Sequence, residues 1–491
     1  MFKPEIILGP PGTGKTTFLL NLVDEALDAG TKPDRIAYLA FTKKAATEAI
    51  DRAQAKFDLV EKDLPYFRTI HSLAFRLLGL RKDEVLGSRT MEEFSDLLGL
   101  RLNGGVDANE GRVYGSTPGD KALFIAAMAR IRCIPLEKQW EEMNEDLGWF
   151  EVERVDRGLR EFKLSRGLKD FTDMLLDCVE RGLSIDTDLL VVDEAQDLSQ
   201  AQWRLVQNLS KRARRTIIAG DDDQAIFRWA GADVEYFIGL EGKTTVLDKS
   251  YRVPKKIQEV AARVIDRVTV RRHKDWSPRD EDGEVSYHGS TDDIDMVKGS
   301  WLVLARNEYL LDDVEKQCRR EGLVYTRRGR RSISDRDLST IKAWESLRKG
   351  GEASAKDVRN ILRYIVHTGP GLPKSGLFVM DDLRRTWGIS TDEIWHEAFD
   401  KMSLIERSYL LSALRQGEKI TKTPRINLST IHSAKGGEAD SVILYTDMSR
   451  RTFQGMMKAP EDERRVFYVG ATRAKQSLYI INPKSKFHFT S

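Results

Sequence analysis

A glycine-rich stretch near the start of the chain has the residue types and spacing of a phosphate-binding loop. The sequence "GPPGTGKT" matches G-x-x-x-x-G-K-[ST]. Its glycines let backbone N–H groups curl around phosphate oxygens, and the helix N-terminus that follows adds its positive dipole end. We expect Lys15 to contact the terminal phosphates and Thr16 to ligate Mg²⁺. The stretch predicts a nucleoside triphosphate site formed by Gly9, Pro10, Pro11, Gly12, Thr13, Gly14, Lys15, Thr16 and Thr17.

A second chemical signal is an acidic pair at the end of an apolar run. The run "LLVV" is typical of a buried parallel strand, and Asp193 and Glu194 follow it directly. In open α/β sheets the carboxyl ends of the strands face the ligand crevice. We therefore expect Asp193 to hold Mg²⁺ and Glu194 to orient or deprotonate the water that attacks the γ-phosphate.

A third segment, "GDDDQAIFRWAGAD" at 220–233, follows another short apolar run. Gln224 could hydrogen-bond either the γ-phosphate or its attacking water. Phe227 and Trp229 follow, and large aromatics are normally core residues, but the flanking Asp, Gln, Arg and Gly make a poor core setting. Exposed rings suit stacking on the bases of a single strand, which contributes about 1–3 kcal/mol per base and tolerates any sequence. The hypothesis is that one loop senses the γ-phosphate at one end and grips a base at the other.

Segments along nearly the whole chain resemble, in order, the motifs of the UvrD/Rep/PcrA family of superfamily 1 helicases. Three of them are the phosphate loop, "DEAQD" at 193–197 and "GDDDQAIFRWAGA" at 220–232. Any one could arise by chance, whereas an ordered set does not. The others are "AYLAFTKKAATEAIDRA" (37–53), "RTIHSLAFRLL" (68–78), "DFTDMLL" (170–176), "LDKSYRVP" (247–254), "WLVLARNEYLL" (301–311), "INLSTIHSAKGGEADSVIL" (426–444) and "ERRVFYVGATRAKQSLYI" (463–480).

The resemblance implies ATP and Mg²⁺ as cofactors, 3′→5′ movement and roles for individual residues. Arg252 and Arg473 match two arginines that reach toward the γ-phosphate, where a planar, permanently charged donor stabilises transition-state charge. Tyr251 matches the aromatic that stacks on the nucleotide base, and Glu438 matches a ribose contact. The residues that match the single-strand contacts are Thr42, Thr69, His71, Thr430 and His432.

This sequence departs from the family pattern at two places that bear on function. The family usually recognises adenine with a glutamine-containing segment upstream of the phosphate loop, and with eight residues before Gly9 we expect that segment to be missing. Selectivity among nucleoside triphosphates is therefore open. In the third segment, Ala230 stands where an arginine is usual, and Phe227 replaces the usual tyrosine.

The alternation of strand and helix patterns predicts parallel sheets flanked by helices. Together with the resemblance, it indicates an α/β fold of two RecA-like P-loop lobes, each carrying a mainly helical insertion. We expect the first lobe at 1–79 and 166–245, with its insertion at 80–165. We expect the second lobe at 246–335 and 425–491, with a short insertion at 336–424.

Composition narrows the class of protein without identifying it. Lys and Arg number 79 and Asp and Glu 77, so the strong basic excess of many nucleic-acid binders is missing. Two basic clusters, at 270–274 and 325–332, are typical of solvated faces and are candidates for phosphate contact. Scattered cysteines and histidines give neither a disulfide framework nor a metal pattern. With neither a membrane-length apolar run nor a secretory signal in the sequence, we expect a cytoplasmic protein.

The predicted function is an ATP-driven 3′→5′ single-stranded DNA translocase and helicase that acts on single strands and single/double-strand junctions in repair or replication. The sequence identifies no loading or repair partner. Three alternatives stay open: a translocase that strips proteins from DNA and unwinds little, a nucleotide-switched DNA-binding module that does not move, and an RNA motor.

Overall fold

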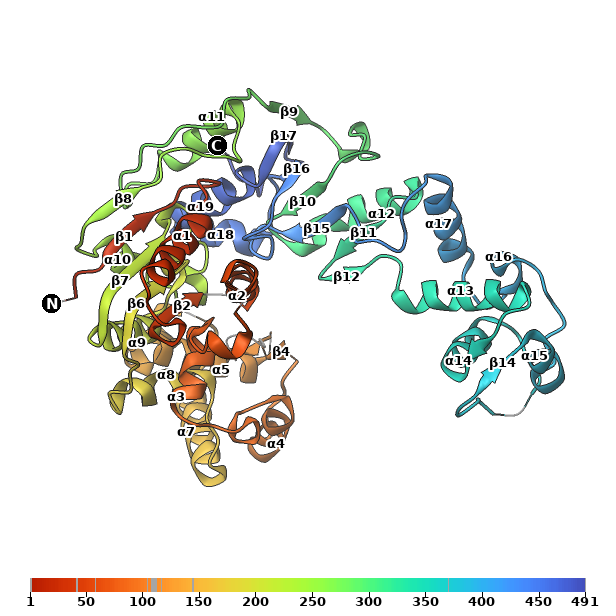
Figure 1. Cartoon of the computed structure of the whole chain (residues 1–491), viewed down its shortest axis with the longest axis horizontal. Helices are drawn as coiled ribbons and strands as arrows, with labels where there is room; N and C mark the ends of the chain where they lie inside the picture. Colours follow the sequence, from red (N-terminus) through yellow and green to blue (C-terminus); the bar gives the residue numbers. More distant parts are fainter. Residues whose placement is uncertain are drawn as a thin grey trace. The chain divides into compact units, whose positions relative to one another are not determined.

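The structure is a computed structural model that describes residues 2–40, 43–57, 59–103, 105–106, 113–115, 117–143, 145–369 and 371–490 (Figure 1). The chain divides into two compact units. The first contains Met1–Val253, Val264–Asp280 and Glu461–Tyr468, and the second contains Pro254–Arg263, Glu281–Pro460 and Val469–Ser491.

The first unit is built on a six-stranded sheet whose order is β3-β2-β6-β7-β1-β8. Every strand pair in this sheet is parallel, so all carboxyl ends lie at one edge. Its strands are β1 (Glu5–Leu8), β2 (Ile36–Ala40), β3 (Phe67–Thr69), β6 (Thr187–Val192), β7 (Ala213–Gly220) and β8 (Thr244–Val246).

Alternate residues of these strands enter two hydrophobic cores, one on each face of the sheet. In β6, for example, Leu190 and Val192 pack in one core while Leu189 and Val191 pack in the other. This two-sided burial explains why the strand sequence is apolar throughout rather than alternating. One core is covered by α1 (Lys15–Asp28) and α2 (Lys43–Phe57), and the other by α3 (Ile70–Leu77), α8 (Phe171–Glu180), α9 (Gln200–Ser210) and α10 (Val234–Ile238).

Between β3 and β6 the first unit carries an additional group of helices with its own core. Phe94, Val152 and Val155 are fully buried in that core. The helices are α4 (Ser88–Leu98), α5 (Pro118–Ile131), α6 (Leu136–Met143) and α7 (Trp149–Arg166), with a short β4–β5 pair at Gly105–Val106 and Val113–Tyr114.

The second unit is built on a seven-stranded sheet whose order is β12-β11-β15-β10-β16-β17-β9. All its strand pairs are parallel except β11–β12. The strands are β9 (Glu284–His288), β10 (Trp301–Ala305), β11 (Tyr325–Arg327), β12 (Arg330–Arg331), β15 (Ile426–Thr430), β16 (Ala439–Tyr445) and β17 (Ala474–Ile481). Its helices include α12 (Asp312–Glu321) and α18 (Arg450–Lys458), while α11 (Lys255–Ile265) and α19 (Pro460–Ala471) each have residues in both units.

A mainly helical segment leaves this second sheet after β12 and returns at β15. Its helices share one continuous core with the sheet, in which Trp344 and Phe399 are fully buried. In Figure 1, α14 and α15 lie around β14. The elements are α13 (Asp335–Arg348), β13 (Ala353–Ser354), α14 (Ala355–Tyr364), β14 (Leu377–Phe378), α15 (Met380–Trp387), α16 (Trp395–Ala398) and α17 (Leu404–Arg415).

Two parallel-sheet lobes that each carry a mainly helical insertion confirm the predicted fold class. The residue bounds predicted for the lobes and insertions stay a prediction. Across the part of the chain that the structure describes, no helix has the length and apolar character needed to span a membrane.

Candidate functional site

The phosphate loop joins β1 to α1 in the first unit, and its backbone adopts conformations that favour glycine. Gly12 and Gly14 have φ values of 74° and 73°, in the left-handed region. A Cβ at Gly9 would lie 2.7 Å from the Cβ of Lys15, so this position also requires glycine. Helix α1 begins at Lys15, directly after the loop. The predicted loop therefore has the strand, turn and helix order that a phosphate site needs.

The side chain of Lys15 is buried against the acidic pair that follows β6. Its Nζ contacts Asp193 and donates to Glu194 Oε1 at 2.7 Å. Burial alone would lower the pKa of Lys15, but the two carboxylates outweigh burial and hold that pKa above its ordinary value. The lysine therefore keeps its charge in a site with little water.

Further contacts fix the carboxylate of Asp193. Tyr38, on β2, donates its hydroxyl to Asp193 Oδ2 at 2.9 Å. The Thr16 hydroxyl lies 3.5 Å from the same oxygen. Hard oxygen ligands of this kind, completed by phosphate and water oxygens, suit Mg²⁺. The two predicted metal ligands are thus neighbours, and among the described residues no group of three or more His, Cys, Asp or Glu forms an all-protein metal site.

Glu194 has an unusual backbone conformation for a residue with a side chain. Its φ of 55° lies in the left-handed region, which non-glycine residues rarely occupy. Its backbone N–H donates to Asp193 Oδ1 at 2.8 Å, and its Oε2 accepts from Gln196 Nε2 at 2.5 Å. The strained turn and these hydrogen bonds fix the carboxylate that we expect to act on water.

A chain of hydrogen bonds connects Glu194 with Gln224. Gln196 Oε1 accepts from the backbone N–H of Asp221 at 3.0 Å, and Asp221 Oδ2 accepts from Gln224 Nε2 at 2.7 Å. A Cβ at Gly220 would lie 2.4 Å from Gln196 Oε1, so glycine permits this close approach. The two predicted catalytic groups are therefore linked through Gln196 and Asp221, at the ends of β6 and β7.

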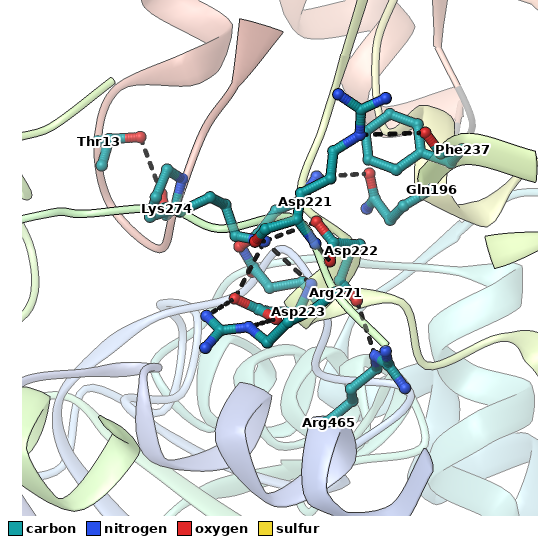
Figure 2. A network of polar contacts seen from close by, with 12 residues as sticks. Thr13, Gln196, Asp221, Asp222, Asp223, Phe237, Arg271, Lys274 and Arg465 are labelled. Carbon is teal, nitrogen blue, oxygen red and sulfur yellow. Dashed lines mark hydrogen bonds and ion pairs between the residues drawn. The ribbon is translucent and has the colours of Figure 1, made fainter. Parts of the chain in front are cut away.

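The three aspartates after β7 are buried around one lysine (Figure 2). The Nζ of Lys274 lies 2.6 Å from Asp222 and 3.1 Å from Asp223. It also lies 3.3 Å from Asp221, and its side chain has no exposed surface. Burial raises the pKa of Asp221 to about 6, although the ammonium of Lys274 acts in the opposite direction.

Arginines complete this buried network (Figure 2). Arg271 donates two hydrogen bonds to the carboxylate of Asp223, at 2.9 and 2.6 Å. The backbone N–H of Arg272 donates to Asp222 Oδ2 at 2.8 Å. Arg465, on α19, donates to the backbone oxygen of Asp222 at 2.9 Å and is 1% exposed. The loop after β7 is therefore held by residues that come far later in the sequence.

The segment of Tyr251 and Arg252 lies directly on the phosphate loop. The N–H of Tyr251 donates to Gly12 O at 2.8 Å, and Ser250 Oγ donates to Pro11 O at 2.7 Å. The ring of Tyr251 is 73% exposed. The structure thus places two residues predicted to contact nucleotide beside the loop predicted to bind its phosphates.

The two predicted stacking aromatics follow the buried aspartates. Trp229 is 48% exposed, and Phe227 is half-buried. Between them, Arg228 forms ion pairs with Glu235 at 2.5 Å and Asp462 at 3.1 Å. Trp229 has the exposure that base stacking requires.

The other predicted DNA contacts of the first unit have structural roles. Thr69 caps α3 by accepting from Ser72 N at 3.2 Å. His71 is 8% exposed, and its ring meets Phe171 edge to face at 5.5 Å. Thr42 lies outside the described residues. Contact of these residues with DNA stays a prediction.

The remaining predicted residues belong to the second unit. Arg473 is 2% exposed, and its Nε donates to Val469 O at 3.0 Å. Glu438 forms a 2.6 Å ion pair with Lys475. Thr430, at the end of β15, accepts from Ser433 N at 3.2 Å, and His432 lies in the turn that follows.

Two protein families match this chain and together span more than half of it. Residues 2–245 match the UvrD/REP helicase N-terminal domain. Residues 390–485 match the UvrD-like helicase C-terminal domain. The chain belongs to the UvrD/REP helicase family. The family resemblance predicted from the ordered motifs is confirmed.

Curated relatives of this UvrD/REP family chain carry the name ATP-dependent DNA helicase PcrA. The protein of Bacillus subtilis is 22% identical, over 99% of this chain and 82% of that protein. The Staphylococcus epidermidis protein is 25% identical over 66% of this chain and 45% of its own length, and the Staphylococcus aureus protein is 25% identical over 60% and 42%. The chain thus spans less than half the length of these staphylococcal relatives. A solved arterivirus nonstructural protein 10 (helicase) shares 12% identity over 98% of this chain and 60% of that chain, with a TM-score of 0.35.

The sequence did not reveal all residues of this UvrD/REP family site. The cluster at 270–274 was interpreted as a solvated face or a phosphate contact, and for Lys274 the solvated-face interpretation is wrong because its side chain is fully buried. The aspartates of 221–223 predict a poor core setting, yet they are buried, with the ammonium of Lys274 beside them. A lysine and three aspartates about fifty residues apart give no local pattern. Gln196 is part of the "DEAQD" motif, but the sequence does not predict its hydrogen bonds to Glu194 and Asp221.

The steric fit of Gly12 predicts that a methyl group will weaken nucleotide binding. In Gly12→Ala, the new Cβ would lie 2.3 Å from the Cβ of Arg252 and 2.8 Å from Ser250 Oγ. Steric overlap of this kind costs about 1–3 kcal/mol, so we expect affinity for an ATP analogue to fall about tenfold in an equilibrium titration. Gly30→Ala is the matched control, because its φ of 87° gives similar backbone strain while no atom lies within 4 Å. Equal losses in both variants would contradict the steric explanation.

The raised pKa of Asp221 predicts a specific pH dependence of stability. Between pH 4 and about 6 the folded protein keeps this carboxyl protonated while the unfolded chain has lost the proton. The contribution of Asp221 to the free energy of unfolding therefore falls as pH rises through this window. The groups that face Asp221 are Asp222, Asp223 and Lys274, together with the amide of Gln224.

In Asp221→Asn the titrating group is gone. Denaturant unfolding at several pH values should show the free energy of unfolding of the variant improving relative to the unmodified protein as pH rises from about 4 to about 6. A difference that is constant with pH would contradict the assignment.

Proposed function

We propose that this chain is an ATP-dependent DNA helicase that moves 3′→5′ along single-stranded DNA. The observation that carries the proposal is the hydrogen-bonded chain from Glu194 through Gln196 and Asp221 to Gln224. These hydrogen bonds join the groups expected around a γ-phosphate. The loop that carries Gln224 continues to Trp229, whose side chain is exposed. Family membership and the names of the curated relatives support the same conclusion.

Each group at the nucleotide has a role that its chemistry supports. Lys15 supplies a cation for the terminal phosphates, and its two carboxylate partners would be exchanged for phosphate oxygens when nucleotide binds. Glu194 accepts a proton from the attacking water, which Gln224 orients. Arg252 and Arg473 stabilise the charge that develops on the γ-phosphate. Thr16 and Asp193 would hold Mg²⁺, which when bound neutralises charge between the phosphates.

The remaining predicted contacts belong to the same proposal. Tyr251 would stack on the nucleotide base, since its own backbone N–H contacts Gly12 and its side chain is exposed. Glu438 would contact the ribose. The single strand and the single/double-strand junction would meet Thr42, Thr69, His71, Thr430 and His432, with Phe227 and Trp229 stacking on bases. We also propose that the protein acts in the cytoplasm and serves in DNA repair or replication.

Removal of the proposed general base should separate binding from hydrolysis. Glu194→Gln keeps the shape of the side chain and loses the proton acceptor, so phosphate release should fall at least about 100-fold while ATP binding persists. Glu5→Gln, in a half-exposed ion pair with Arg215, is the control and should hydrolyse normally. Turnover of Glu194→Gln near the normal rate would overturn the role given to this carboxylate.

Removal of both rings should uncouple the nucleotide site from the strand. In Phe227→Ala with Trp229→Ala, loss of stacking costs about 1–3 kcal/mol per base, so single-stranded DNA should stimulate ATP turnover only weakly. Nucleotide binding should persist. Phe150→Ala, which removes a ring that is 82% exposed on α7, is the control. Unchanged stimulation in the double variant would remove the stacking hypothesis.

Two substrates distinguish this proposal from its rivals. A forked duplex without bound protein should be unwound, whereas a translocase that only displaces proteins would leave it intact. ATP turnover with no response to single-stranded DNA would indicate a nucleotide-switched binding module that does not move. Stronger stimulation by RNA than by DNA oligonucleotides would indicate an RNA motor.

A further inference from the structure

We propose that Lys274 is a positioning residue for nucleotide hydrolysis, which fixes the loop of Gln224 by binding its three aspartates from within the fold. This inference rests on the proposed function, since it concerns the same nucleotide site. Lys274 lies about fifty residues beyond that loop in the sequence, outside the phosphate loop, the acidic pair and the aromatic segment.

The contacts of Lys274 are those of a central anchor. Its ammonium touches a carboxylate oxygen of each of the three aspartates, and it also donates to the backbone oxygen of Arg272 at 3.1 Å. The aspartate side chains have 0–1% exposure, so water does not screen this charge. Arg271 engages one of the three aspartates by a bidentate contact, whereas Lys274 binds them all (Figure 2).

Without that ammonium, the loop would contain buried carboxylates in excess of the cations near them. Buried carboxylates without a partner either take up protons or move toward water. Either response changes Asp221, whose Oδ2 accepts from Gln224 and whose N–H donates to Gln196. The disturbance would therefore reach the orienting amide of Gln224 and, through Gln196, the carboxylate of Glu194.

The segment that carries Lys274 also contacts the other side of the nucleotide site. Ser277, three residues later, accepts from the N–H of Ser250 at 2.9 Å. Ser250 in turn donates to Pro11 O in the phosphate loop at 2.7 Å. The segment from Lys274 to Ser277 therefore contacts both the loop of Gln224 and Ser250, which packs on the phosphate loop. Its position thereby helps to fix the loop of Gln224 relative to the phosphate loop.

The test measures kcat and KM for ATP in the full chain with saturating single-stranded DNA. Lys274→Met removes the charge and keeps much of the volume. We expect kcat to fall about 10- to 100-fold, as for a catalytic group displaced by about 1 Å, with KM changed less than about threefold. Lys274→Arg keeps a cation and should restore a large part of kcat. Lys169→Met, which removes a 2.8 Å ion pair with Asp177, is the matched control and should leave both constants unchanged.

A second variant decides the question if Lys274→Met fails to fold. Asp221→Asn lowers the buried negative charge, so the loop keeps its cations, but the new amide faces Gln224 Nε2 with a donor. Gln224 must then turn its amide over, and kcat should fall about tenfold with KM preserved. A merely structural role for the network predicts normal kcat in this variant.

The outcomes separate this inference from the proposed function. If the unmodified protein does not hydrolyse ATP in response to single-stranded DNA, the proposed function fails and the inference fails with it. If the unmodified protein responds, and either folded variant, Lys274→Met or Asp221→Asn, keeps kcat within twofold, the inference alone is overturned. A loss confined to KM would likewise overturn it, since positioning of the water-activating groups acts on kcat.

Discussion

Three carboxylates on consecutive residues repel one another, and taking them out of water is unfavourable unless positive charge is buried with them. In this protein the loop after β7 satisfies that constraint with Lys274 and Arg271. A segment from much later in the chain is packed on this loop and supplies both cations. Gln224 donates to one of these aspartates, Asp221, and Trp229 follows five residues later in the sequence.

The sequence was sufficient to place the side chains that stand at the ends of three strands of the first sheet. The apolar runs before Gly9, Asp193 and Asp221 predicted parallel strands, and in a parallel sheet their carboxyl ends share one edge. That geometry alone brings Lys15, Asp193 and Glu194 together, as the structure shows. The fold class followed from the same alternation of strands and helices, and family membership followed from the order of the motifs.

The sequence was insufficient where function depends on pairing between distant segments. Lys274 and Arg465 lie in different parts of the chain, and neither has a local pattern that marks it as buried. A basic cluster normally indicates solvent exposure, because charged side chains are rarely buried without a partner of opposite charge. The sequence does not show which distant residues supply such partners. Likewise, the sequence did not reveal that the hydroxyl of Thr69 caps α3, because that role depends on where the helix begins.

The division into two units has a consequence for dissecting this chain into parts. The N-terminal family match ends at residue 245, whereas the cations that neutralise its acidic loop lie at Arg271 and Lys274. A fragment truncated at that boundary would lack these cations, although the phosphate loop, the acidic pair and the aromatic segment would still be present in it. The N-terminal family match therefore does not contain all the residues that its acidic loop needs. A chimera with a homologue should keep the segment of Arg271 and Lys274 together with the first half of this protein.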